Sequence, residues 1–136
     1  MSSFDPKLQQ SAFSALEYSH SPYSNRRIGA ALRLSNGKTY SGTNIENASY
    51  GGTVCAERVA IFKAYSENKL PVSISEIFVA SESAAPWPPC GFCRQVLAEF
   101  ASEDTLVTIG NMQGKTKTFK FKDLLPEAFS PKNFND

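Results

Sequence analysis

The residues of this sequence that are best suited to chemistry are its three cysteines and one nearby carboxylate. Glu57 lies two residues after Cys55, and Cys90 and Cys93 belong to a Pro-Cys-x-x-Cys segment. Thiolates at such spacings near helix starts are good zinc ligands, and a carboxylate beside them can move protons for a water at the metal. We therefore interpret the two segments as one catalytic metal site.

The number of available ligands favours a catalytic zinc over a structural one. A structural zinc normally takes four protein ligands, but the sequence has no fourth cysteine. The only histidine, His20, lies in a Ser-His-Ser-Pro segment, where an exposed loop side chain is the expected interpretation. The fourth ligand position is then left for water. Arg58 and Arg94 are either ordinary surface charges or donors of hydrogen bonds to the sulfurs, and we favour the second role.

Parts of this pattern also allow two other interpretations. Cys90 and Cys93 alone also match a thioredoxin-like dithiol, but a redox pair gives no purpose to Cys55 and Glu57. A glutamate near a helix start is often only a partner of the helix dipole. Beside three cysteines we expect Glu57 to act as an acid and base instead, taking a proton from water and returning it to a leaving amine.

Composition excludes several classes of protein. The 136 residues include 41% hydrophobic residues, which predicts one globular domain over residues 1–136. The 14 basic and 13 acidic residues leave no basic surface for polymeric nucleic acid, although a small nucleic-acid-derived molecule stays open. No apolar run approaches the length of a membrane span, and no secretory signal is present. An odd number of cysteines and these absences predict a cytoplasmic protein that does not bind membranes.

Hydrophobic periodicity and turn signals predict the elements that position the site. A helix runs from Pro6, after an Asp5 cap, to about Tyr18, and Asn36-Gly37 predicts a β-hairpin. A second helix, capped by Thr53, carries Cys55, and a third carries Cys93. A last short helical segment begins at Asp123, before a polar tail from residue 130. The predicted strands are 28–34, 38–42, 74–80, 106–109 and 117–121.

The order of these elements places the metal site. Alternation of strand and helix in the middle of the chain favours an α/β layered sheet. The two cysteine-bearing helices are expected to begin together at the carboxyl ends of neighbouring strands, beside the crevice where such sheets bind ligands. Asn44 and Glu46 lie two residues apart, and on an extended backbone they face the same side. They form either part of a simple turn or a pair of hydrogen-bonding groups for the vicinal hydroxyls of a sugar.

The two cysteine segments resemble the zinc-dependent nucleoside deaminases, whose signature is a ligand-x-Glu followed by Pro-Cys-x-x-Cys, with a three-cysteine variant. Over almost its whole length the chain is similar to the small homotetrameric cytidine deaminases. The matching segments are Ser21-Pro22-Tyr23-Ser24, Ile28-Gly29-Ala30-Ala31, Gly42-Thr43-Asn44-Ile45-Glu46-Asn47-Ala48-Ser49-Tyr50, Cys55-Ala56-Glu57-Arg58, Cys90-Gly91, Cys93-Arg94-Gln95-Val96 and Leu124-Leu125-Pro126-Glu127-Ala128-Phe129.

The resemblance implies a three-layer α/β/α sandwich, with a mixed five-stranded sheet and helices on both faces. It implies one Zn²⁺ per subunit and hydrolysis of cytidine and 2′-deoxycytidine to uridine and 2′-deoxyuridine with release of ammonia, in pyrimidine salvage. Asn44 and Glu46 then hold the ribose 3′-hydroxyl. Tyr50 and Phe129 reach the sites of neighbouring subunits in a homotetramer.

The sequence departs from the pattern of the family at three places. Arg26 stands where the family usually has a base-packing phenylalanine, Phe92 where alanine is common, and Trp87-Pro88 where serine is common. A guanidinium can stack on a flat base, and Phe92 or Trp87 can supply the missing aromatic surface. The alternative is a deaminase of a modified cytosine nucleoside or nucleoside antibiotic. A non-enzymatic, zinc-stabilised binding module is a third interpretation.

Overall fold

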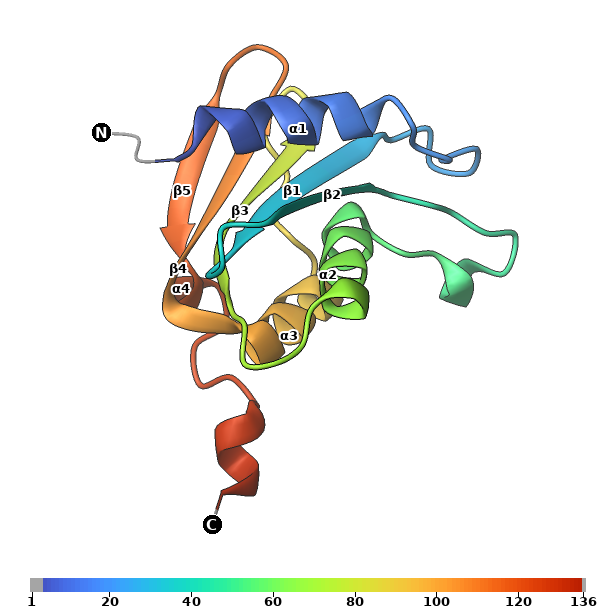
Figure 1. The fold of residues 1–136 in the computed structure, drawn as a ribbon. Coiled ribbons are helices and arrows are strands. Elements are labelled where there is room, and N and C mark those ends of the chain that lie inside the picture. Colours follow the sequence, from blue (N-terminus) through green and yellow to red (C-terminus); the bar gives the residue numbers. More distant parts are fainter. Residues whose placement is uncertain (1–3, 136) are drawn as a thin grey trace.

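A five-stranded sheet with helices on both faces forms the framework of the computed structural model, which describes residues 4–135 (Figure 1). The sheet has the order β2-β1-β3-β4-β5 and is mixed, because β3 and β4 are parallel and the other neighbours are antiparallel. The strands are β1 (Ile28–Leu34), β2 (Thr39–Thr43), β3 (Ile74–Ser81), β4 (Ala101–Asn111) and β5 (Thr116–Lys120).

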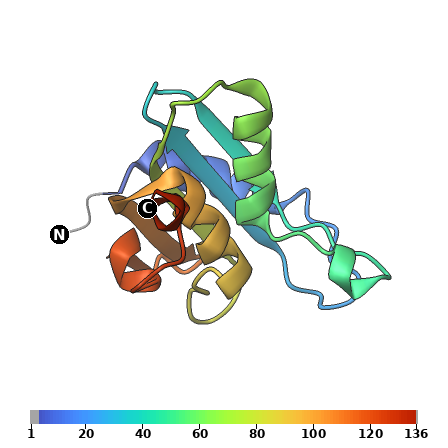
Figure 2. The same ribbon diagram turned by 90° about the horizontal axis from the view of Figure 1, so that it is seen from below.

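The helices lie in two layers, as the three-layer prediction requires. In Figures 1 and 2, α1 covers one face of the sheet, while α2 and α3 lie side by side on the other. The helices are α1 (Pro6–Leu16), α2 (Ala56–Glu67), α3 (Gly91–Phe100) and α4 (Phe121–Leu124), with short 3₁₀ helices η1 (Tyr50–Gly52) and η2 (Pro131–Phe134). None of the helices that the structure describes is long and apolar enough to cross a membrane.

Two hydrophobic clusters hold these layers together, one on each face of the sheet. Under α1, Leu8 and Leu16 pack against Phe78, whose ring is fully buried. On the other face, small and branched side chains of α2 and α3 pack on β1, β3 and β4, and Ile61 and Leu97 lie at the centre. Burial of this apolar surface is the main favourable contribution to folding. The cysteine-bearing helices therefore rest on a rigid base.

The predicted hairpin and crossover both form. Gly37 has a φ of +89°, and the backbone of Leu34 bonds to Lys38 across the turn, so β2 returns antiparallel to β1. β3 continues through α3 into β4, and such a helical crossover makes two strands parallel. Gly42 lets α2 approach β2 closely, because a Cβ there would lie 2.6 Å from the Ala60 nitrogen.

Some predicted boundaries were wrong for local reasons. Thr53 does not cap α2, because its hydroxyl accepts a hydrogen bond from the Asn47 N–H and the helix cap is Cys55. Strand β4 starts at Ala101 rather than at Leu106. The hydrophobic pattern does not reveal this early start, because residues 102–104 are polar and exposed and the register to β3 shifts there. Phe121 begins α4 instead of ending the last strand.

Candidate zinc site and adjoining cavity

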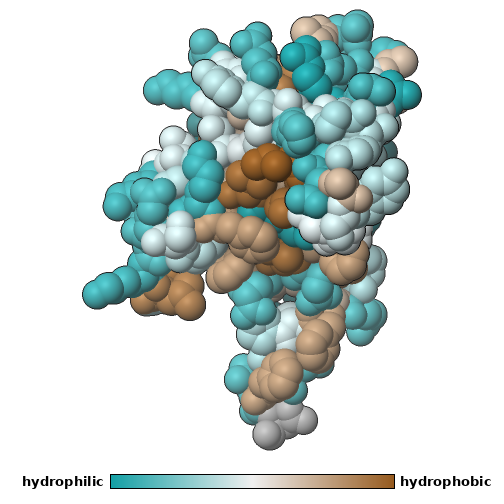
Figure 3. Space-filling view, turned by 90° about the vertical axis from the view of Figure 1, so that its right-hand side faces the viewer, coloured by the Kyte–Doolittle hydropathy of each residue, from teal (hydrophilic) through white to brown (hydrophobic). Residues whose placement is uncertain are grey.

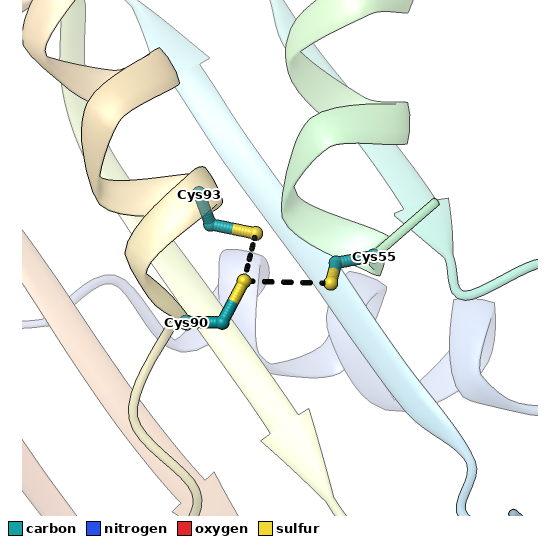
Figure 4. Close-up of side chains that lie close together, drawn as sticks. All are labelled: Cys55, Cys90 and Cys93. Carbon is teal, nitrogen blue, oxygen red and sulfur yellow. Dashed lines mark hydrogen bonds between the residues drawn. The ribbon is translucent and has the colours of Figure 1, made fainter. Parts of the chain in front are cut away.

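The three cysteine sulfurs meet where two helices begin. Cys55 is the N-cap residue of α2, Cys90 is the N-cap residue of α3, and Cys93 lies in the first turn of α3. The sulfur of Cys90 lies 3.7 Å from that of Cys55 and 3.5 Å from that of Cys93 (Figure 4). All three sulfurs lie within 4.8 Å of one another. The sequence prediction that these residues converge is confirmed.

This arrangement fits a zinc ion. A tetrahedral zinc with Zn–S distances of about 2.3 Å separates its sulfurs by roughly 3.8 Å, close to the two shorter distances above. Neither Cys55 nor Cys90 caps its helix with a side-chain hydrogen bond. The two helix N-termini therefore keep their preference for a negative charge, which thiolates supply.

The sulfurs differ in how readily they give up a proton. Hydrogen bonds from the Cys93 thiol and from Arg58 lower the pKa of Cys55 to about 5. The pKa of Cys93 is raised, because its thiol donates to Cys55 and is buried. Without a metal, one sulfur thus becomes a thiolate at the expense of another. For all three sulfurs to be thiolates together, a bound cation would have to balance their charge.

Glu57 lies in the first turn of α2 and is almost fully buried, at 4% exposed. Removal from water disfavours the carboxylate, and the negative charge of Cys55 adds to this effect, so the pKa of Glu57 is raised to about 7. A carboxyl group with such a pKa can both accept and donate a proton at neutral pH. This is the property that a general acid and base needs.

The sequence interpretation expected the two cysteine-bearing helices to follow neighbouring strands, and this expectation was wrong. Helices α2 and α3 follow β2 and β3, and β1 lies between these two strands. A long connection spans the gap from β2 to α2, and it is held by backbone bridges of Ile45 with His20 and with Val54. His20 itself is exposed, as expected, and contributes backbone bonds rather than its side chain.

The two arginines near the cysteines have different partners. Arg58 donates to the Cys55 sulfur at 3.5 Å, and its guanidinium lies 5.5 Å from the centre of the Phe92 ring. Arg94 instead donates to the carbonyl oxygens of Pro89 and Leu124, both at 2.8 Å. The geometry therefore matches the expected sulfur contact for Arg58, whereas Arg94 fixes the backbone just before Cys90.

A cavity of about 310 Å³ adjoins the sulfurs and Glu57. Its volume is at the small end of the range for sites that bind small molecules. Of the predicted substrate residues, Arg26, Asn44 and Glu46 line it. The other lining residues are Ser24, Ile28, Thr53, Cys55, Ala56, Glu57, Val79, Trp87, Pro88 and Cys90.

Asn44 and Glu46 are each fixed by neighbouring groups. The Asn44 side chain accepts from the Ile28 N–H at 3.0 Å and donates to the Arg26 carbonyl at 2.8 Å. Glu46 accepts from the backbone N–H of Tyr23 at 2.9 Å and of Ser24 at 3.1 Å, and from the Ser24 hydroxyl. The hydrogen bond from the Ser24 side chain leads the effects that lower the pKa of Glu46. A carboxylate is therefore present in this wall at neutral pH.

Tyr50 and Phe129 do not line this cavity within the described chain. Tyr50 is 74% exposed at the start of η1, and the centre of its ring lies 5.7 Å from that of Tyr23. Phe129 is 60% exposed, and the centre of its ring lies 5.6 Å from that of Phe134. Both rings point to surfaces that this chain leaves uncovered.

The sequence interpretation gave no individual role to two residues of this region. Ser24 lines the cavity and holds Glu46, and its signal was its place in the Ser-Pro-Tyr-Ser segment. Asn111 holds the loop before Cys90 by donating to the carbonyls of Ser83 and Ala84. Asn111 is the last residue of β4, and an asparagine just after the predicted strand 106–109, at the start of a turn, was the only local signal for it.

Three cysteines that can hold a metal ion, beside a buried carboxyl group on an α/β/α sheet, are the features expected of a zinc-dependent hydrolase. Comparison with known families is in accord with this class. The model of the family described as "Cytidine and deoxycytidylate deaminase zinc-binding region" matches residues 2–109. The chain belongs to the cytidine and deoxycytidylate deaminase family, and its three cysteines are suited to the zinc that this region binds.

Individual relatives cover nearly the whole chain. The cytidine deaminase of Halalkalibacterium halodurans is 47% identical over 129 residues, which cover 95% of this chain and 96% of the relative. That of Sporosarcina psychrophila is 40% identical and covers 95% of this chain and 93% of its own. The crystal structure of cytidine deaminase from Burkholderia pseudomallei has a TM-score of 0.87 at 42% identity, and covers 93% of this chain and 99% of its own.

Proposed function

We propose that this protein hydrolyses cytidine and 2′-deoxycytidine to uridine and 2′-deoxyuridine and releases ammonia. One observation carries the proposal: two of the three cysteines, Cys55 and Cys90, line one cavity of nucleoside size together with the buried Glu57 and the polar pair Asn44 and Glu46. Hydrolysis of the base and recognition of the sugar can therefore occur in one bound molecule. The names of the relatives described above support the same activity.

The residues of this chain have separate parts in the proposed reaction. Zinc held by Cys55, Cys90 and Cys93 activates the attacking water when it is bound. Glu57 takes a proton from the water and gives it to N3 of the pyrimidine as oxygen bonds to C4. Glu57 then carries the remaining hydroxyl proton to the amine, and the C4–N bond breaks to give ammonia. The sum is cytidine plus water to uridine plus ammonia.

Asn44 and Glu46 are the proposed ligands of the ribose 3′-hydroxyl. The bonds described above leave one N–H of the Asn44 amide and part of the acceptor capacity of the Glu46 carboxylate unused. A sugar hydroxyl can donate to Glu46 and accept from Asn44. Because the 3′-hydroxyl is common to ribose and 2′-deoxyribose, this pair accepts both nucleosides and excludes free cytosine.

Arg58 is the proposed partner that stabilises the negative charge on the sulfurs. Its pKa is raised in spite of partial burial, because the side chain bonds to the Cys55 sulfur. We assign to Arg94 a different task, since its bonds to two backbone carbonyls hold the segment that delivers Cys90.

The proposed enzyme is a homotetramer whose sites are shared between subunits. Tyr50 and Phe129 support this proposal, because both rings are largely exposed and neither lines the cavity of its own chain. The C-terminal segment after α4, which carries Phe129, projects from the body and presents hydrophobic residues on its surface (Figures 1 and 3). In the proposed tetramer, Tyr50 and Phe129 complete the sites of neighbouring subunits.

The proposal also covers the setting of the reaction. Residues 1–136 act as one catalytic domain in pyrimidine salvage in the cytoplasm, where a reducing environment keeps the three cysteines free. The partners are small nucleosides, and neither polymeric nucleic acid nor membrane is involved. The nearly balanced charge supports the first of these exclusions.

The direct test is deamination by the purified, zinc-loaded protein, followed by ultraviolet absorbance and by ammonia release. Cytidine and 2′-deoxycytidine are expected to give equal amounts of ammonia and deaminated nucleoside, and free cytosine none. If the protein converts modified cytosine nucleosides but not cytidine, the alternative function is correct, namely deamination of a modified cytosine nucleoside or nucleoside antibiotic. Zinc binding without any deamination would contradict an enzymatic function.

A further inference from the structure

Two loops that are distant in sequence meet at the wall of the cavity. The loop before β1 carries Arg26, and the loop after β3 carries Trp87. Because Ile28, the first residue of β1, pairs with Ser81, the last residue of β3, both loops lie at the same end of these two strands. The Arg26 guanidinium lies 5.9 Å from the centre of the Trp87 ring, and both residues line the cavity.

The loop that carries Trp87 is held on both sides of the tryptophan. Before it, Glu82 accepts two hydrogen bonds from Arg27, at 2.8 and 2.7 Å. Asn111 then donates to the next two carbonyls, at 3.1 and 2.9 Å. After it, the Pro89 carbonyl accepts from Arg94.

Proline further restricts this loop. Residues 86, 88 and 89 are all proline, so three of the four positions from 86 to 89 have a fixed φ. An indole presented by such a segment loses little conformational freedom when a ligand contacts it. Pre-organisation of this kind favours binding because less entropy is lost on association.

The Asn111 side chain is itself buried and fully used. Its amide nitrogen makes the two bonds to the loop, and its oxygen accepts from the backbone N–H of Gln113 and Lys115 at 3.1 and 3.0 Å. At 1% exposed, it joins the β4–β5 turn to the Trp87 loop. The position of Trp87 is thus tied to the sheet.

The chemistry of the wall suits a flat, uncharged ring. The cavity surface is largely apolar near Ile28, Val79 and Trp87, and Arg26 is the only cationic side chain among the described residues that line it. An indole presents a large π face that stacks on any nucleobase. A guanidinium packs on the same kind of face, and this contact orients the ring.

We propose that Trp87 is the substrate-binding residue against which the nucleobase stacks, and that Arg26 positions its indole through their cation–π contact. This inference rests on the proposed function, because it names the residues that hold the base of the same substrate. Phe92 has no part in it. The Phe92 ring is 74% exposed and packs near Arg58, outside the residues that line the cavity.

Trp87 is the only tryptophan in the chain, so fluorescence excited selectively at tryptophan, and not at the tyrosines, reports on this wall alone. Zinc-loaded E57Q, which is not expected to turn over, is titrated with cytidine. A base that stacks on the indole is expected to change the emission with a saturable dependence on cytidine concentration. Unchanged emission at saturating cytidine would overturn the inference.

Kinetics with matched variants give the second readout. W87L is expected to raise KM for cytidine about 10-fold and to change kcat by less than about threefold, because the indole binds the base but moves no proton. W87F, which keeps an aromatic face, should recover most of this loss. Y18L serves as the control, since Tyr18 is an exposed aromatic residue just past α1 and does not line this cavity.

Variants of Arg26 separate a positioning role from a merely structural one. R26M is expected to raise KM by about two- to fivefold and to shift the Trp87 emission before any ligand is added. R26K, which restores a cation, should reverse both effects. Unchanged emission in R26M would contradict the positioning role.

The outcomes distinguish this inference from the proposed function. If the wild-type protein converts cytidine while the W87L variant keeps its KM and the emission does not respond, only the inference fails. If the zinc-loaded wild type converts no nucleoside, the proposed function fails. If W87L does not fold, as judged by zinc content and thermal unfolding, the KM of W87F and the fluorescence titration of E57Q test whether the base stacks on Trp87.

Discussion

The starts of α1 and of the two cysteine-bearing helices are built on opposite plans. At α1, the Asp5 carboxylate accepts the Lys7 N–H at 2.9 Å and Pro6 occupies the first turn. At α2 and α3, Cys55 and Cys90 hold the same N-cap position but make no capping hydrogen bond. Side chains that satisfy a helix start are worth about 1 kcal/mol each.

The difference shows where the chain gives up local stability for function. A capped start has its polar groups satisfied and can bind nothing further. An uncapped start with a thiolate keeps its dipole for a charged ligand, and it depends on a metal to balance the sulfurs. We therefore expect loss of zinc to destabilise the α2 and α3 side of the sheet and to leave α1 largely unaffected.

The largest expected effect is that of Cys90→Ala. Removal of one of three ligands should abolish tight zinc binding and reduce deamination to the background of the assay, with a lower midpoint of thermal unfolding. Metal content measured by elemental analysis, together with cytidine turnover, checks this. Asp5→Ala is the matched control at another helix start and should keep its zinc. A C90A variant with full zinc and normal turnover would disprove the proposed ligand set.

A smaller effect is expected at the sugar-binding wall, with Glu46→Gln. The amide is a weaker acceptor than the carboxylate, so KM for cytidine should rise about 10- to 100-fold. Zinc content should not change, because Glu46 makes its bonds to the loop at 23–24 rather than to the cysteines. Steady-state kinetics with Glu67→Gln as an exposed control on α2 decide the point, and an unaltered KM in E46Q would exclude Glu46 from substrate binding.

The smallest effect is expected at α1, with Asp5→Ala. This change removes a cap and one of the two ion pairs of Arg33, whose other partner is the buried Glu76. The free energy of unfolding should fall by about 1–2 kcal/mol, while kcat and KM stay unchanged. Urea unfolding of the zinc-loaded protein measures this.

A surface ion pair provides the control for Asp5. Asp104 is 79% exposed in its side chain and lies 3.7 Å from Lys120, so Asp104→Ala should change stability by less than about 0.5 kcal/mol. An equal loss in D5A and D104A would mean that the cap of α1 contributes nothing specific.

The cysteines, Glu57 and most elements of the fold could be predicted because their signals are local. Cys55 and Cys90 each stand where a loop gives way to a helical pattern, and Gly37 marks its own turn. The cap at Thr53 was wrong because its hydroxyl is used by Asn47, a contact set by loop geometry. The early start of β4 escaped notice because residues 102–104 are polar and exposed.

Contacts between distant segments could not be predicted in the same way. The pairing of Arg26 with Trp87 depends on the register of β1 with β3, and the bonds of Asn111 depend on where the Trp87 loop ends. The expectation that Arg94 bonds to sulfur differed from the structure for a similar reason. Two backbone carbonyls lie within its reach once α4 folds beside α3.

The most direct measurement of the central claim is zinc content and cytidine turnover of Glu57→Gln. Glu57 is not a metal ligand in this account but the group that moves protons. E57Q should therefore keep one zinc per chain, while kcat falls by about 10⁴-fold. A zinc-replete E57Q protein that turns over cytidine at the wild-type rate would contradict the account.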